Sequence, residues 1–133
     1  MRIGRREFLA AAGVAISGGE RLFAVPLAQK GRDMFGLIGK VTTVPGQRDA
    51  FIDILLQGTG GMPGCLSYIV AKDPADDNAL WITEVWDSQA SHEASLSLPS
   101  VKEAIGKGRA MIAGFGDRVV TTPVGGVGLT RSP

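Results

Sequence analysis

The sequence has 133 residues, a formal net charge of +1 at pH 7, one histidine and one cysteine. A near-neutral chain lacks the basic surface that nucleic acids or anionic membranes attract, which argues against both as partners. One histidine and one cysteine cannot complete a closed zinc site within a chain, and the lone Cys65 cannot form an intramolecular disulfide. The length suits one compact domain and is too short for two.

The N-terminal segment has the layout of a signal peptide. Arg5 and Arg6 are followed by Glu7-Phe8-Leu9, and apolar stretches cover residues 10–18 and 22–28. The apolar run is shorter than the about 20 residues that span a bilayer. We therefore predict a twin-arginine signal peptide over residues 1–28, recognition of Arg5 and Arg6 by the twin-arginine export machinery, and a periplasmic or secreted protein. A disordered basic tail or a docking helix is the alternative.

The remaining chain begins with an alternation of strand and helix patterns. Residues 35–42 alternate with period two and predict a strand that Pro45-Gly46 ends. Apolar residues at helical spacing then predict a helix that stops at Gly58. Met62-Pro63-Gly64 predicts a turn into a second strand at 66–72, and a polar turn over 73–78 leads to a third strand at 79–86.

Helical patterning resumes after Asp87-Ser88, either of which is a candidate N-cap. Pro99 interrupts this helix, and Ser100 with Glu103 offers a capping box for the next one. Gly114 and Gly116 predict a turn into a final strand at 118–122, and a glycine-rich tail follows.

This order, β-α-β-β-α-β, predicts a ferredoxin-like α+β fold, in which helices cover one face of a four-stranded antiparallel sheet. In the third strand Leu80 and Ile82 lie on one face, while Trp81 and Val85 lie on the other. Because both faces are apolar, we predict a homodimer in which a second subunit covers the face without helices.

Three segments together carry a family resemblance. Glu84-Val85-Trp86-Asp87-Ser88 takes a strand with an acid and a tryptophan into a helix start, and Pro63-Gly64-Cys65-Leu66-Ser67-Tyr68 takes a turn into a strand. With the helix between Pro45 and Gly58, this order resembles the antibiotic biosynthesis monooxygenase domain over residues 34–126, leaving 127–133 as a tail. The resemblance implies a dimeric α+β barrel. In the quinol-oxidising branch of the family it also implies that the substrate's own carbanion activates oxygen, with no cofactor and no metal.

The same resemblance points to a pocket at the end of the third strand. In the quinol-oxidising branch a tryptophan at the position of Trp86 lines the pocket, with an asparagine four residues earlier and a tyrosine six residues later. Here these flanking positions hold Ile82 and His92. We predict that His92 and Trp86 are catalytic, and that Tyr68, Trp86 and Ile82 bind the substrate.

Each of these residues also has a purely structural interpretation. His92 suits an exposed site on a polar helix surface, and Trp86 suits the core. Glu84 is predicted to be an ion-pair or hydrogen-bond partner near the strand end, and Cys65 a small buried hydrophobe. The haem-degrading branch is disfavoured. Its tryptophan and axial histidine would fall near Ser95 and Ile105, and neither residue can take those roles.

Two functions follow from the sequence. The first is a cofactor-independent monooxygenase or oxidoreductase that acts on a small quinol-like aromatic with O₂. His92 would be its base or orienting group, since an unperturbed histidine titrates near neutral pH. The alternative is a non-catalytic module of the same fold that binds a small aromatic or is associated with stress.

Overall fold

The structure is a computed structural model that describes residues 33–129. The predicted signal segment at residues 1–28 and residues 130–133 of the tail lie outside this range. The elements follow one another along the chain as β1 (Phe35–Thr43), α3 (Arg48–Gly58), β2 (Cys65–Lys72), β3 (Ala79–Trp86), α4 (Gln89–Ser95), α5 (Pro99–Gly108), the 3-10 helix η1 (Arg109–Met111) and β4 (Ile112–Thr121). No helix within residues 33–129 is both long and apolar enough to cross a membrane.

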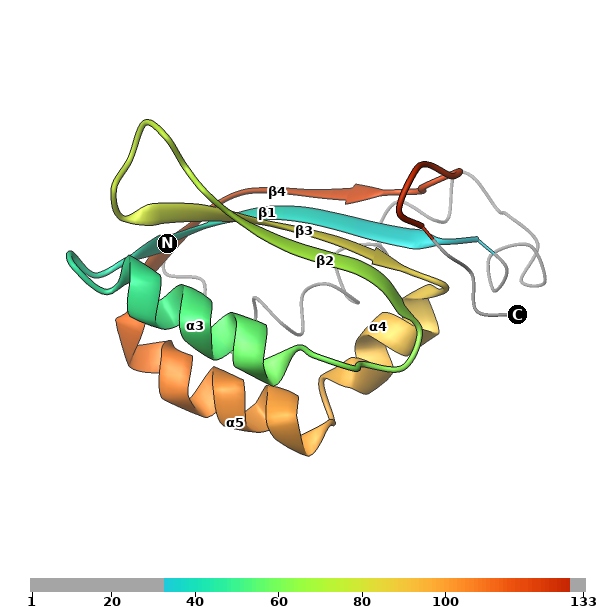
Figure 1. Ribbon diagram of the computed structural model, residues 1–133, viewed down its shortest axis with the longest axis horizontal. Helices are drawn as coiled ribbons and strands as arrows, with labels where there is room; N and C mark the ends of the chain where they lie inside the picture. The colour runs from blue at the N-terminus through green and yellow to red at the C-terminus, as the bar shows by residue number, and fades with distance from the viewer. Residues whose placement is uncertain (1–32, 130–133) are drawn as a thin grey trace, which may run out of the picture.

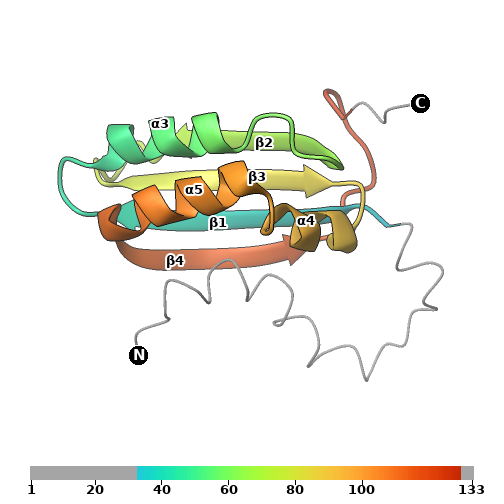
Figure 2. The same cartoon turned by 90° about the horizontal axis from the view of Figure 1, so that it is seen from below.

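The four strands form a single antiparallel sheet in the order β2-β3-β1-β4. Helices α3, α4 and α5 all lie on one side of this sheet (Figure 1). Seen from the helix side, α3 and α5 run next to each other along the strands, and α4 lies near the end of β3 (Figure 2). This arrangement confirms the predicted ferredoxin-like α+β fold.

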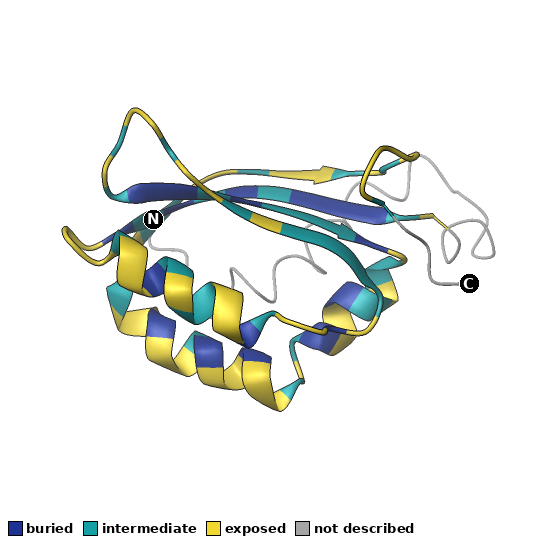
Figure 3. Cartoon of the chain, in the orientation of Figure 1, coloured by how far each residue is buried: buried dark blue, intermediate teal, exposed yellow. Residues whose placement is uncertain are grey.

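The core lies between the sheet and the helices. Leu80 and Ile82 of β3 are 0% and 5% exposed, whereas Trp81 and Val85, on the opposite face, are only half-buried. Buried residues are concentrated in β1, in β3 and on the helix surfaces that face the sheet (Figure 3). A large aliphatic side chain contributes roughly 1.5–3 kcal/mol when fully buried, so this layer is the main source of stability.

Helix α5 begins at Pro99, and the predicted capping box is wrong. Leu98 is the N-cap residue and makes no side-chain capping bond, and Pro99 is at the start of the helix. Proline suits this position because its fixed φ is helical and its missing N–H would have no helical partner. Ser100 therefore lies inside the first turn, and Glu103, beyond that turn, pairs with Lys107 at 2.9 Å on the exposed surface.

Strand β4 begins at Ile112, six residues before the predicted start at 118. Gly114 and Gly116 lie within the strand, and Gly114 is in register with Thr42 of β1. Pairing with β1, which continues through two shifts of register, outweighs the local preference of these glycines for a turn.

Helices α3 and α5 pack closely at two glycines. A Cβ atom on Gly58 would lie 2.5 Å from the Cβ of Ala104, and one on Gly108 would lie 2.7 Å from the Phe51 ring. The absence of side chains at these positions lets the helices approach each other. Gly58, predicted to stop the helix, is the last residue of α3, and Thr59 is the C-cap.

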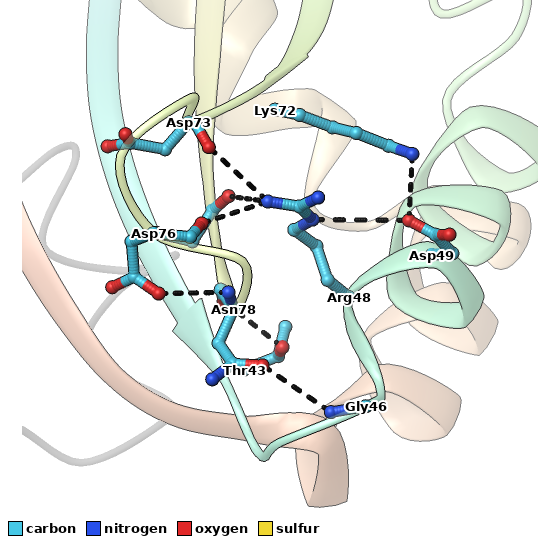
Figure 4. A network of polar contacts seen from close by, with 9 residues as sticks. Thr43, Gly46, Arg48, Asp49, Lys72, Asp73, Asp76 and Asn78 are labelled. Carbon is cyan, nitrogen blue, oxygen red and sulfur yellow. Dashed lines mark hydrogen bonds and ion pairs between the residues drawn. The ribbon is translucent and has the colours of Figure 1, made fainter.

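One arginine fixes the polar turn between β2 and β3 (Figure 4). Arg48, at the start of α3, donates from Nη1 to the backbone carbonyls of Asp73, Asp76 and Ala79, at 3.4, 2.9 and 3.3 Å. Hydrogen bonds from a charged donor are stronger than neutral ones. They hold the end of β3 that is opposite to Trp86.

Candidate active site

A cavity of about 90 Å³ lies between the sheet and the helices. Every strand and helix from β1 to β4 contributes to its wall, and most of the lining side chains are apolar. The polar lining residues are Thr59, Tyr68, Glu84, His92, Ser95 and Arg109. An apolar cavity with a few converging polar groups is the usual form of a small-molecule site.

The junction of β3 and α4 brings an indole and an imidazole together. Trp86 is the last residue of β3 and is 0% exposed. The hydroxyl of Ser88 caps α4 by accepting the N–H of Ser91 at 3.1 Å, which starts the helix at Gln89. His92 therefore lies one turn into the helix, and its ring meets that of Trp86 edge-on, with 5.5 Å between the centroids.

His92 is buried and uncharged at neutral pH. Its exposure is 3%, and its ring lies 5.2 Å from that of Phe35. Burial and, secondarily, the positive charge of Arg118 lower the pKa of His92 to about 4. The prediction that His92 titrates near neutral pH is therefore wrong, and so is the alternative that it is an exposed helical histidine. The enclosed Nδ1 atom has no hydrogen-bond partner among residues 33–129.

Glu84 also lines the cavity, and the sequence alone did not assign it a catalytic or binding role. Ile82, Glu84 and Trp86 are spaced two residues apart along β3, so their side chains share one face of the sheet. The Glu84 carboxyl group therefore lines the cavity. Trp86 donates from Nε1 to Oε1 of Glu84 at 3.1 Å, which confirms Glu84 as a hydrogen-bond partner. Burial raises the pKa of Glu84 to about 7, although the Trp86 bond and Arg118 act in the opposite direction.

The β2 strand adds two neutral groups beside Glu84. Tyr68 is directly opposite Glu84 in the β2–β3 register. Burial and the charge of Glu84 raise the pKa of Tyr68, so its hydroxyl stays protonated. Burial likewise raises the pKa of Cys65 to about 11, and its Sγ donates weakly to the carbonyl of Ser67 at 3.5 Å. A thiol with this pKa is a poor nucleophile at neutral pH.

Strand β4 places the positive charge of Arg118 near Glu84. Arg118 is in register with Gly39 of β1, and Gly39 is in register with Ile82 of β3. Arg118 is close enough to favour the ionised form of Glu84 and to disfavour the protonated form of His92. Its own pKa is lowered by burial and raised by Glu84.

The four predicted site residues, His92, Trp86, Tyr68 and Ile82, all line this one cavity. Their catalytic and binding roles stay predictions. Among residues 33–129 no cluster of three histidine, cysteine, aspartate or glutamate side chains could hold a metal ion.

The fold and the cavity together define a class, the small α+β domains with a ligand cavity between sheet and helices. Within this class the chain belongs to the antibiotic biosynthesis monooxygenase family, whose model matches residues 34–107. The match covers the region from the start of β1 to the end of α5, and it confirms the resemblance that the sequence indicated.

Individual relatives agree with this assignment. A solved structure from Chloroflexus aurantiacus, provisionally named an antibiotic biosynthesis monooxygenase, is 61% identical with a TM-score of 0.72, over 73% of this chain and 99% of that one. A similarly named structure from Deinococcus radiodurans is 22% identical with a TM-score of 0.58, over 70% and 95% of the two chains, and shares the fold. An uncharacterised protein from Synechocystis is 24% identical over 101 residues, 69% of either chain. None of these names specifies a substrate.

Proposed function

We propose that the protein is a cofactor-independent monooxygenase or oxidoreductase that uses O₂ to oxidise a small quinol-like aromatic. The observation that carries this proposal is the convergence of Trp86, His92 and Glu84 in one mostly apolar cavity. An electron-rich aromatic can bind there by apolar contact, while two groups with shifted pKa values can bond to its hydroxyl. Activation of oxygen by the substrate's own carbanion is what the resemblance to the quinol-oxidising branch implies.

His92 has the properties of an orienting group. A neutral imidazole in the cavity wall has one nitrogen that donates and one that accepts, so it is suited to form a hydrogen bond with a substrate hydroxyl. With a pKa of about 4, it is a weak base at neutral pH. Trp86, Tyr68 and Ile82 supply the apolar and aromatic walls against which a ring packs.

The cavity volume limits the size of the substrate. About 90 Å³ is less than the 300–1,000 Å³ common for pockets that hold drug-sized ligands. The protein should therefore act on one-ring quinols before polycyclic ones. Arg109 is the exposed member of the lining, so entry is expected on its side.

The proposal is tested by oxygen uptake of the purified protein with a panel of one-ring hydroquinones, in air and under nitrogen. Wild-type protein should increase uptake above the blank. His92→Ala should lower kcat/KM by about 10²-fold through the loss of orientation. Glu93→Ala, at the next residue of α4 but exposed, is the control and should have no effect. If no hydroquinone raises oxygen uptake, the proposed activity is wrong.

The alternative function is a non-catalytic module that binds small aromatics. The observation in its favour is Ile82, an apolar wall residue where the quinol-oxidising branch has an asparagine. In that case aromatic ligands should quench the fluorescence of Trp86 without any oxygen uptake. A Trp81→Phe background leaves Trp86 as the one tryptophan of the chain and assigns the signal.

We also propose that the protein is a homodimer whose subunits pack through the open sheet face. Ile69, Thr83, Ile38 and Val119 form a row across all four strands of this face, and Ile69 and Val119 are 57% and 50% exposed. Sedimentation should give twice the chain mass. Ile69→Lys should shift it toward the monomer, whereas a lysine at Leu56, 54% exposed on α3, should not. A wild-type monomer at micromolar concentration would contradict the proposal.

A further inference from the structure

The cavity holds a carboxyl group besides the imidazole of His92, and this carboxyl group is better suited to accept a proton. We infer that Glu84 accepts the hydroxyl proton of the substrate, and that Trp86 is a positioning residue that holds the Glu84 carboxyl group through its indole N–H. This inference rests on the proposed function for the substrate class, a small aromatic with a hydroxyl group.

The position of the Glu84 carboxyl group is fixed from three strands. In register, Glu84 lies between Tyr68 of β2 and Leu37 of β1, and it shares the cavity face of β3 with Trp86. Trp86 is completely buried, so its Nε1 is held in place while it donates to Oε1 at 3.1 Å. A carboxyl group held in this way is preorganised for proton transfer.

His92 faces the same space from α4. It lines the same cavity as Glu84, and its ring packs edge-on against Trp86, the residue that holds Glu84. A ligand hydroxyl in the cavity can therefore bond to His92 while its proton is directed to Glu84. The imidazole orients the hydroxyl, and the carboxylate takes the proton.

The charges around Glu84 favour this division of roles. The titratable groups that face it or line the same cavity are Tyr68 and Cys65 of β2, His92 of α4, Arg109 of η1 and Arg118 of β4. The residues that β1, α3 and α5 contribute to the lining are uncharged. Burial raises the pKa of Glu84 to about 7, close to the working pH that suits a general base, and Arg118 limits that rise.

The step conserves atoms and charge. The O–H bond of the substrate breaks, its electron pair stays on the substrate oxygen, and a new O–H bond forms on the Glu84 carboxylate. The negative charge moves from Glu84 to the aromatic oxygen. The resulting phenolate is the electron-rich species that the proposed reaction with O₂ requires.

The kinetic test uses 1,4-hydroquinone and oxygen uptake as a function of pH. For wild-type protein kcat/KM should rise through an apparent pKa near 7. Glu84→Gln should lower kcat/KM by about 10²- to 10⁴-fold and remove this rise. Trp86→Phe should move the rise to higher pH. The indole N–H of Trp86 stabilises the ionised Glu84 carboxylate, so removing it raises the pKa of Glu84. Glu93→Gln, an exposed carboxylate-to-amide control, should change neither.

A direct test needs no turnover. 4-Nitrophenol absorbs in the visible when ionised, so its colour reports proton transfer. Because Glu84 has a pKa of about 7, it and the bound nitrophenol should share one proton near neutral pH. The ionised band should therefore develop in two steps over a broad pH range with wild-type protein, and in a single step with Glu84→Gln. Identical bands in both proteins, or equal hydroquinone activity in both, would overturn the inference and leave the proposed function standing.

The two ideas can fail separately. If wild-type protein consumes no oxygen with 1,4-hydroquinone, the proposed function fails and the nitrophenol spectra alone decide whether Glu84 accepts a proton. If Glu84→Gln does not fold, the pH profile and nitrophenol spectrum of Trp86→Phe decide instead. An unshifted profile would then count against the role of Trp86 and Glu84, since a purely structural tryptophan would change stability without moving an apparent pKa.

Discussion

Replacing Glu84 by glutamine should make the stability of the protein depend strongly on pH, whereas the unaltered protein should show a flatter curve. The reason is that Glu84 and His92 titrate in overlapping ranges with opposite effects. The pKa of Glu84 is raised from 4.5 to about 7, and that of His92 is lowered from 6.5 to about 4. The two windows overlap between about pH 4.5 and 6.5.

The sign of each contribution follows from counting protons. Between pH 4.5 and 7 the native state keeps the Glu84 proton that the unfolded state has lost, so the free energy of unfolding falls as pH rises. Between pH 4 and 6.5 the unfolded state binds a proton at His92 that the native state does not, so the free energy of unfolding rises with pH. A shift of about 2.5 units corresponds to up to about 3 kcal/mol for each group, so the two largely cancel.

Urea unfolding, followed by tryptophan fluorescence between pH 4 and 8 at fixed protein concentration, measures this effect. Relative to wild type, Glu84→Gln should lose up to about 3 kcal/mol of stability as the pH falls from 7 to 4.5. His92→Gln should show the opposite slope and become more stable relative to wild type as the pH falls from 6.5 to 4. Glu93→Gln serves as the exposed control. Differences from wild type that are independent of pH in both variants would refute the assigned electrostatics.

Three further predictions concern the scaffold and export. Gly58→Ala should be less stable than Gly106→Ala by about 1–3 kcal/mol in urea unfolding, because both gain helix propensity but only Gly58 is crowded; equal values would contradict the close packing. Gly64→Ala should cost more than about 1 kcal/mol, since its φ is +81° and a Cβ would collide with α4; a smaller loss in thermal unfolding would refute this. Replacing Arg5 and Arg6 together by lysine should retain the protein in the cytoplasm, and unchanged recovery outside it would rule out twin-arginine export.

The fold was predictable wherever local signals agree with each other. The third strand, residues 79–86, was predicted with its observed bounds, because an alternating apolar pattern lies between a polar turn and the Asp87-Ser88 cap. The start of β4 was missed because Gly114 and Gly116 favour a turn locally, while strand pairing with β1 decides the outcome. The start of α5 is not predicted because a proline after a helical stretch indicates an interruption, whereas proline is also a common first residue of a helix.

The site was predictable in its position and only partly in its chemistry. The end of the third strand and the first turn of the next helix located Trp86 and His92 at one cavity. The period of two also places Glu84 on that face, and an acid among apolar neighbours is a local conflict of the kind that marks functional positions. The shifted pKa values were beyond reach of the sequence, because Arg118 comes from a distant strand and burial depends on the packed helices.

The shifted values reverse the usual order of proton affinity between a carboxyl group and an imidazole. Burial disfavours the charged form of each group, so it raises the pKa of Glu84 and lowers that of His92. The charge of Arg118 lowers both values, which keeps His92 neutral and prevents Glu84 from remaining fully protonated at neutral pH. A proton that enters the cavity is therefore taken up by Glu84 before His92. Environments that separate the pKa values of neighbouring groups assign different roles to them, and here they make the carboxylate the base and the imidazole its neutral hydrogen-bonding partner.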